Sequence, residues 1–291
     1  MKISIIGAGV MGLDTAITCA AYGHNILLID ISSEVLVNLA SRVSSEFRLY
    51  RMLKPEFKSL DISELKARIQ FTSSYEEIED CDWVIENVNE EWATKQDVYK
   101  KITPYIKPET YVAANTSCIS ITKIAAALPF PQKVLGLHFM NPVPIKKCVE
   151  VIKGFHTSEQ TLTEAKKFLQ SIEKNPVIVE DFPGFVSNRL SHLFMNEAAF
   201  LVQDNLASPQ DIDRIFKEGY GHAMGPLETA DLIGLDTVVN SLQVLYESYQ
   251  DPKYRCCPLL RKMVEAGNLG RKSGKGFFNY KNSNDKNAEY S

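Results

Sequence analysis

Short apolar runs alternate with helical apolar spacing along the first part of the chain. An apolar run at 2–7 is followed by helical spacing over 11–23 and by a second apolar run at 25–30. A strand, a tight turn, a helix and a further strand in this order form a βαβ unit, which requires a parallel sheet. Further strands are expected at 68–74, 82–88, 110–117, 133–139, 148–154 and 176–181.

Strand and helix signals alternate as far as Asp181, and the pattern changes after it. Helical segments at 90–106 and 158–174 still lie between the apolar runs, as in an open α/β sheet with helices on both faces. After Asp181-Phe182-Pro183-Gly184 only helical signals follow, at 185–203, 208–219, 226–249 and 258–267. Ser208 is the expected N-cap of one of these helices, with Pro209 at its first position. The pattern predicts an α/β protein with a Rossmann-type, mostly parallel sheet domain over 1–182 and an all-helical domain over 183–291.

Composition and charge narrow the class of protein without identifying it. The 291 residues are 45% apolar and 23% charged, as in ordinary globular proteins, and no run is long enough to span a membrane. A net charge of -4 gives no general attraction for nucleic acid or an acidic membrane surface. The six cysteines form no CxxC pair and the histidine spacings suggest no metal site. We therefore expect reduced thiols and a cytoplasmic protein.

Three glycines stand between the first strand and the first helix in the spacing G-x-G-x-x-G. Gly7 permits the tight turn, Gly9 lets the backbone approach a pyrophosphate, and Gly12 lets helix and strand pack closely. The helix N-terminus supplies amide donors for the phosphates. Asp30, which ends the second strand, can accept hydrogen bonds from ribose hydroxyls and would repel a 2′-phosphate, so NAD is favoured over NADP. The predicted cofactor turn consists of Gly7, Gly9, Val10, Met11 and Gly12.

Two questions stay open in this region. The glycines could form a purely structural turn beside a surface aspartate, although the complete strand–turn–helix–strand context favours dinucleotide binding. Asp14 lies just inside the first helix, where a negative charge suits the helix dipole. The same charge would weaken the binding of a pyrophosphate if the side chain faced the ligand.

The apolar run 134–144 contains a histidine and ends in two prolines. His138 lies at the expected carboxyl end of its strand, where open α/β sheets bind ligands. An imidazole suits the base that takes a hydroxyl proton as hydride leaves an alcohol. Because the prolines forbid a helix, the chain turns, and Glu150 can meet His138 and fix its tautomer. Taken singly, His138 would more often be a core histidine and Glu150 a solvent-facing residue.

Motifs over nearly the whole chain resemble those of one enzyme family. GAGVMG, ANTSCISIT, GLHFMNPVP, VEVI, DFPGFVSNR, MGPLE, IGLD and LGRKSGKGFFNY stand in the order and spacing of the L-3-hydroxyacyl-CoA dehydrogenase family. The strongest similarity is to its bacterial 3-hydroxybutyryl-CoA dehydrogenase branch. The resemblance implies NAD as cofactor, a homodimer formed through the helical domain, and an active site between the two domains. The implied reaction is the oxidation of a (3S)-hydroxyacyl thioester to the 3-oxoacyl thioester, or its reverse.

The resemblance also implies roles for single residues. His138 matches the catalytic base and Glu150 its partner, while Ser117 and Asn188 match residues that hold the 3-oxygen and the thioester region of the substrate. Further NAD contacts are implied for Glu90, Lys95 and Asn115. Without the resemblance, Ser117 would be interpreted as the cap of a helix at 120–128 and Asn188 as a surface amide.

The region that contacts the CoA nucleotide in this branch departs from its pattern. Glu46 stands where a small polar residue is expected and Leu53 where a lysine is expected, although Arg48, Arg51 and Lys54 are nearby. A carboxylate repels a phosphate, so an alternative substrate is a hydroxyacyl group held on an acyl carrier protein. A third interpretation is a non-catalytic NAD-binding structural protein. The joint presence of the four catalytic-site residues argues against it.

Overall fold

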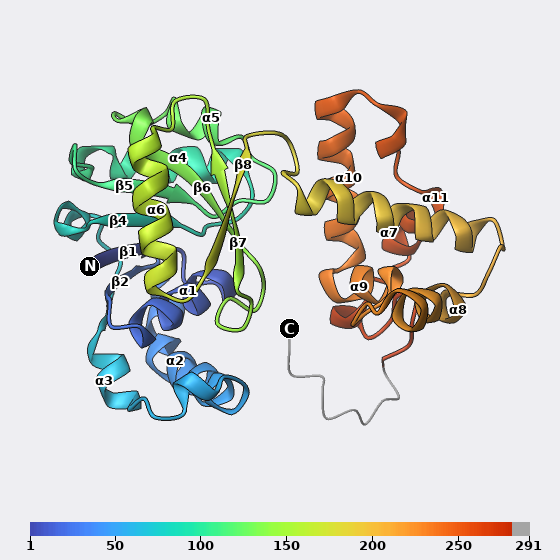
Figure 1. The fold of residues 1–291 in the computed structure, drawn as a ribbon, viewed down its shortest axis with the longest axis horizontal. Coiled ribbons are helices and arrows are strands. Elements are labelled where there is room, and N and C mark those ends of the chain that lie inside the picture. Colours follow the sequence, from blue (N-terminus) through green and yellow to red (C-terminus); the bar gives the residue numbers. More distant parts are fainter. Residues whose placement is uncertain (281–291) are drawn as a thin grey trace. The chain divides into compact units, whose positions relative to one another are not determined.

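The structure, a computed structural model, describes residues 1–280 (Figure 1). The chain divides into two compact units, of which the first, unit 1, covers Met1–Phe182 and the second, unit 2, begins at Pro183. Over residues 1–280, no helix combines the length and the apolar character needed to cross a membrane.

Unit 1 is built on one eight-stranded sheet. The strands follow the order β3-β2-β1-β4-β5-β6-β7-β8. From β1 the chain adds β2 and β3 on one side, and it then crosses to the other side of β1 to add β4 and the later strands. All neighbouring strands are parallel except β6 and β7, which are antiparallel. The predicted mostly parallel sheet is confirmed. The strands are β1 (Lys2–Ile6), β2 (Asn25–Ile29), β3 (Ile69–Thr72), β4 (Trp83–Glu86), β5 (Tyr111–Ala114), β6 (Val134–Phe139), β7 (Cys148–Lys153) and β8 (Asn175–Glu180).

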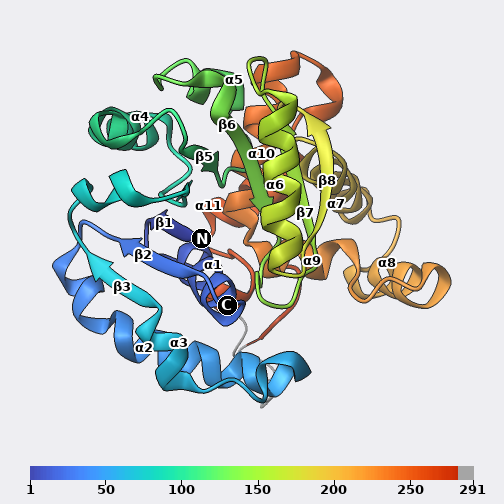
Figure 2. The ribbon, with the colours of Figure 1, turned by 60° about the vertical axis from the view of Figure 1, so that its left-hand side comes forward.

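Successive strand residues alternate between the two faces of the sheet. One face, which includes Ile3 and Ile5, belongs to a core formed with apolar residues of the helices α1, α2, α3 and α6. Figure 2 shows α6 lying across β6, β7 and β8. The opposite face packs against α5, because a Cβ on Gly136 would lie 2.7 Å from the Ile121 side chain. The helices of unit 1 are α1 (Val10–Ala21), α2 (Ser33–Leu53), α3 (Ile62–Ala67), α4 (Trp92–Ile102), α5 (Ile121–Ala125) and α6 (Glu159–Ser171).

Unit 2 has helices and no named strand over its described residues, with isolated β-bridges at Gly270, Lys275 and Asn279. Two predicted helices are divided. Gly234, with φ +102°, separates α9 from α10 within the segment predicted as one helix at 226–249. The helix predicted at 208–219 changes to a π-helix at Ile215–Gly219. Ser208 caps α8 as predicted and accepts a hydrogen bond from Asp211 N at 3.1 Å. The helices are α7 (Ser187–Gln203), α8 (Pro209–Arg214), α9 (Pro226–Ile233), α10 (Leu235–Tyr249) and α11 (Pro258–Glu265).

Candidate active site

His138 and Glu150 face each other across the antiparallel pair β6 and β7. They are register partners, so their side chains must lie on the same face of the sheet. His138 Nδ1 lies 2.7 Å from Glu150 Oε2, and the two residues are 8% and 4% exposed. An ionised carboxylate can only accept, so Nδ1 donates this hydrogen bond, and in the neutral imidazole Nε2 then has the lone pair. The pair has the arrangement of a histidine base with an orienting carboxylate.

Ser117 adds a hydroxyl to this pair. Its Oγ lies 3.2 Å from His138 Nε2, on a loop that follows β5. The three side chains thus come from the ends of neighbouring strands. The interpretation of Ser117 as a helix cap is wrong, because Ser120 caps α5 by accepting a hydrogen bond from Lys123 N at 3.3 Å.

Glu90 holds the loop that carries Ser117. Its Oε1 accepts hydrogen bonds from Ser117 N at 2.8 Å, from Cys118 N at 2.9 Å and from the Thr116 hydroxyl at 2.5 Å. These contacts give Glu90 a structural role in the loop beside His138 that its position in the sequence did not indicate. Its contact with NAD stays a prediction.

Lys95 lies in a buried charge network below this loop. It is 0% exposed, and its Nζ lies 2.8 and 2.9 Å from the two carboxylate oxygens of Glu86. Tyr99 donates to Glu86 Oε2 at 2.6 Å, and Lys95 Nζ also lies 3.3 Å from the carbonyl oxygen of Asn115. All these partners of Lys95 belong to the protein. Direct contact of Lys95 with NAD stays a prediction. Glu86 belongs to no motif in the sequence, and the one signal for it is an acid at the end of an apolar strand.

Asn115 connects two strand ends beside the histidine. Its amide nitrogen donates to Asn87 Oδ1 at 2.7 Å, and its Oδ1 accepts a hydrogen bond from Phe139 N at 3.3 Å. Phe139 directly follows His138 in β6. Asn115 therefore helps to fix the backbone at the histidine, and its contact with NAD stays a prediction.

The glycine turn has the geometry that the motif predicts. Gly7 has φ +94°, and a Cβ there would lie 2.8 Å from Asn87 O. A Cβ on Gly12 would lie 1.8 Å from Gly7 O, whereas a Cβ on Gly9 would meet nothing within 4 Å. Gly7 and Gly12 are therefore required by packing, and Gly9 leaves the surface of the turn open. No described side chain caps the N-terminus of α1 at Val10 and Met11, so its amide groups can bind phosphate.

Asp30 lies beside this turn. Its carboxylate accepts hydrogen bonds from Ala8 N at 2.8 Å and from Ser32 N at 2.9 Å. A carboxylate has about four acceptor positions, so two remain for ribose hydroxyls. Arg42 donates to the Ala8 carbonyl oxygen at 3.0 Å and fixes the turn from α2, a contact that no motif in the sequence indicated.

Comparison with known families gives two matches that together cover almost the whole chain. Residues 2–182 match the NAD binding domain of 3-hydroxyacyl-CoA dehydrogenase, and residues 184–280 match the C-terminal domain of the same enzyme. The chain belongs to the 3-hydroxyacyl-CoA dehydrogenase family.

Relatives in this family are similar over nearly their full length. The 3-hydroxybutyryl-CoA dehydrogenase of Bradyrhizobium diazoefficiens is 40% identical, with 96% of this chain and 95% of that protein covered. The mitochondrial hydroxyacyl-coenzyme A dehydrogenase of Homo sapiens is 34% identical, with 96% and 91% covered. The crystal structure of (S)-3-hydroxybutyryl-CoA dehydrogenase from Ralstonia eutropha has a TM-score of 0.90 and 39% identity, with 96% and 98% covered.

One residue implied by the family resemblance lies in unit 2. Asn188 is in the first turn of α7, and its carbonyl oxygen lies 2.9 Å from His192 Nδ1. Its part in substrate binding stays a prediction.

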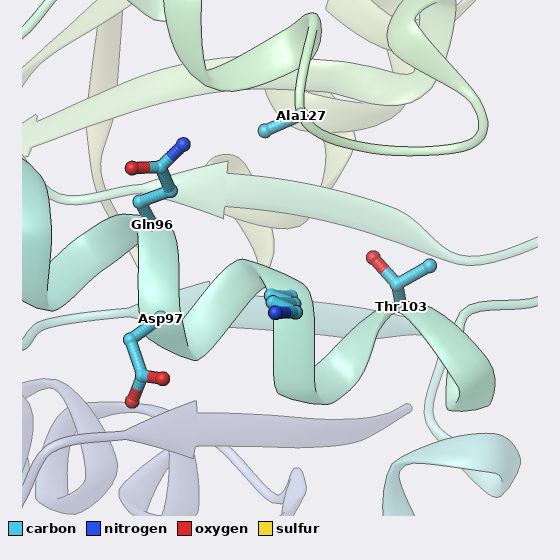
Figure 3. Close-up of a pocket in the computed structure, with 5 residues that line it drawn as sticks. Gln96, Asp97, Thr103 and Ala127 are labelled. Carbon is cyan, nitrogen blue, oxygen red and sulfur yellow. The ribbon is translucent and has the colours of Figure 1, made fainter.

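A hollow of about 670 Å³ lies outside this group of residues. It is lined by Gln96, Asp97, Lys100, Thr103 and Ala127. Figure 3 shows Ala127 across the hollow from Gln96. None of the residues predicted to bind cofactor or substrate lines this hollow.

Asp14 is buried and contacts a neighbouring helix. It is 2% exposed, and its carboxylate accepts a hydrogen bond from the Tyr50 hydroxyl of α2 at 2.7 Å. Burial raises the pKa of Asp14 from 3.8 to about 6, and the hydrogen bond from Tyr50 opposes this shift in part. The first turn of α1 contains no acid. The Asp14 side chain therefore contacts Tyr50 of α2 and lies outside the first turn of α1.

We predict that Asp14→Asn stabilises the protein at pH 8. A raised pKa means that the folded state binds the proton more tightly than the unfolded state, so stability is lost as the pH rises from about 4 to about 6. The substitution should raise the free energy of unfolding at pH 8 by roughly 1–3 kcal/mol, and by much less at pH 4. Urea unfolding at both pH values measures this. The exposed Asp80→Asn is the control, and a gain for Asp14→Asn that is equal at both pH values contradicts the prediction.

Proposed function

We propose that this chain oxidises a short-chain (3S)-hydroxyacyl-CoA to the 3-oxoacyl-CoA with NAD, or catalyses the reverse reaction. The observation that carries the proposal is the group Ser117–His138–Glu150 at the strand ends of the NAD binding domain, with Ser117 Oγ at 3.2 Å and Glu150 Oε2 at 2.7 Å from the imidazole. The relatives named above are 3-hydroxybutyryl-CoA and hydroxyacyl-CoA dehydrogenases, which supports the same substrate class.

In the proposed mechanism His138 is the general base. Its Nε2 takes the proton of the 3-hydroxyl group, and Glu150 stabilises the imidazolium that forms. The Ser117 hydroxyl, within reach of the same nitrogen, holds the 3-oxygen in line with it. NAD, when bound at the glycine turn, would supply the hydride acceptor for carbon 3 of the substrate. Asn188 is proposed to hold the thioester region.

The residues at the glycine turn fit the cofactor. The open surface at Gly9 and the uncapped N-terminus of α1 would receive the pyrophosphate, and the two remaining acceptor positions of Asp30 would bind the adenosine ribose. Burial at the strand ends keeps water from the imidazole, because His138 and Glu150 are nearly inaccessible.

A basic hollow on unit 1 supports CoA as the carrier of the acyl group. A hollow of about 350 Å³ is lined by Arg48, Arg51, Met52 and Lys58. Three cationic side chains around one hollow suit a phosphate-bearing nucleotide. Lys54 does not belong to this group, because its Nζ is bound to the Tyr22 hydroxyl at 2.6 Å and lies 3.8 Å from Glu173.

A carrier-protein substrate and a purely structural role both have less support than a CoA substrate. Glu46 and Leu53, which suggested an acyl carrier protein, are not among the residues that line the basic hollow. The names of the relatives favour neither a carrier-protein substrate nor a structural protein.

The homodimer and the cytoplasmic location stay predictions. Exposed apolar side chains of unit 2, such as Leu190, Leu206 and Ile215, provide surface for the homodimer.

The test of the proposed function is turnover of acetoacetyl-CoA with NADH. We predict that His138→Gln lowers kcat by roughly 10²–10⁴-fold, the usual contribution of a positioned base, and leaves NADH binding unchanged. Glu150→Gln should lower kcat as well, and the double variant should lose much less than the sum of both effects because the pair acts as a unit. Turnover close to wild type in His138→Gln would remove this residue from the mechanism.

A second prediction concerns the CoA nucleotide. Arg48→Ala with Arg51→Ala should raise KM for acetoacetyl-CoA roughly tenfold and leave kcat nearly unchanged, because the nucleotide is remote from the reacting carbon. KM for acetoacetyl-pantetheine, which lacks the nucleotide, should not change. The exposed Arg214→Ala in unit 2 is the matched control. An equal rise in KM for both substrates would show that the arginines do not bind the nucleotide.

A further inference from the structure

Asp181 forms a dense set of hydrogen bonds with the start of α5. Its Oδ2 accepts from the Ser120 hydroxyl at 2.8 Å, from Thr122 N at 2.7 Å and from the Thr122 hydroxyl at 2.6 Å. Its Oδ1 accepts from Ile121 N at 3.1 Å. One carboxylate thus receives four hydrogen bonds from three successive residues of one loop–helix junction.

The same contacts connect α5 to the far edge of the sheet. Asp181 directly follows β8, and its backbone N–H continues the strand pairing by donating to Lys153 O at 3.2 Å. The Thr122 hydroxyl also accepts a hydrogen bond from Phe155 N at 3.0 Å. Asp181 and Thr122 therefore fix the start of α5 to the end of β8 and to the turn after β7, the strand that carries Glu150.

The loop that carries Ser117 is consequently held at both ends by carboxylates. Glu90 binds the backbone N–H groups of Ser117 and Cys118, and Asp181 binds the loop three residues later at Ser120. We infer that Asp181 is a positioning residue that sets the distance between the Ser117 hydroxyl and His138. This inference rests on the proposed function, because it acts through Ser117 as a substrate contact.

The charge and the shape of the side chain both matter to this role. An asparagine at 181 has only one accepting oxygen, so its amide group must face either the single donor at Oδ1 or the three donors at Oδ2. Charge-assisted hydrogen bonds are also stronger than neutral ones. No ammonium or guanidinium group in residues 1–280 lies within 4.0 Å of this carboxylate, so these donors are its direct partners.

The experiment is a double-mutant cycle between Asp181 and Ser117, with acetoacetyl-CoA and NADH as substrates. Asp181→Ala should lower kcat roughly tenfold in the wild-type background and less than twofold in the Ser117→Ala background. Displacement of the loop should have little effect on kcat once the Ser117 hydroxyl is absent. Asp181→Asn and Thr122→Val should give smaller losses with the same dependence on Ser117. Affinity for NADH should stay within about twofold of wild type in every variant.

A matched control separates positioning from helix capping. Asp61 caps α3 of the same unit with hydrogen bonds from Ser63 N at 2.6 Å and Glu64 N at 3.2 Å. Asp61→Ala should lower the thermal midpoint and leave kcat unchanged. Equal losses from Asp181→Ala in both backgrounds, or wild-type kcat in this variant, would overturn the inference while leaving the proposed function intact. A wild-type chain that turns over no 3-oxoacyl-CoA would overturn both.

Discussion

The hydrogen bond between His138 and Glu150 depends on a single antiparallel pairing in an otherwise parallel sheet. Residues opposite one another in such a pair project from the same face, so the register His138↔Glu150 brings the carboxylate to the imidazole. A slip of one residue would move Glu150 to the opposite face of β7 and leave the imidazole without its acceptor. The two prolines between the strands allow the chain to reverse direction. The proposed general base and its carboxylate partner therefore depend on the pairing of β6 with β7.

The strand ends around this pair are held by buried charges. The ion pair between Lys95 and Glu86 is fully buried, and such a pair contributes little net stability because both ions lose their hydration. The pair instead fixes the positions of neighbouring groups, because Lys95 also binds the carbonyl of Asn115. Glu90 binds the backbone at Ser117 in a similar way. These contacts restrict the backbone of the loops that present the reacting groups. Rigid support of this kind is what a positioned general base requires.

Local patterns in the sequence predicted much of the fold and the centre of the site. Each expected strand is present, and the glycine spacing predicted a turn in which Gly7 and Gly12 have no space for a side chain. His138 and Glu150 could be paired because two prolines between adjacent apolar runs imply a reversal of the chain. These predictions use residues close together in the sequence, where periodicity and turn chemistry decide the outcome.

Features that depend on long-range contacts were not predictable in this way. The direction of the Asp14 side chain depends on Tyr50 in another helix, and the cap of α5 depends on Asp181, which lies 61 residues after Ser120. Apolar spacing continues through Gly234, so the sequence pattern predicted one helix there. In the structure Gly234 has a φ of +102°, which is incompatible with a helix and separates two helices. Lys54 was counted among the cations available to CoA, but burial and its contact with Tyr22 exclude it.

We propose that Glu150 keeps the proton of neutral His138 on Nδ1, so that Nε2 can accept a proton from the substrate. The most direct test is nitrogen-resolved NMR of the histidine side chains at a pH where His138 is neutral, with His138→Gln used to assign the signal. We expect a protonated Nδ1 and an unprotonated Nε2 in the wild-type protein. A proton on Nε2 would contradict it, because the nitrogen beside Ser117 could then not act as the base.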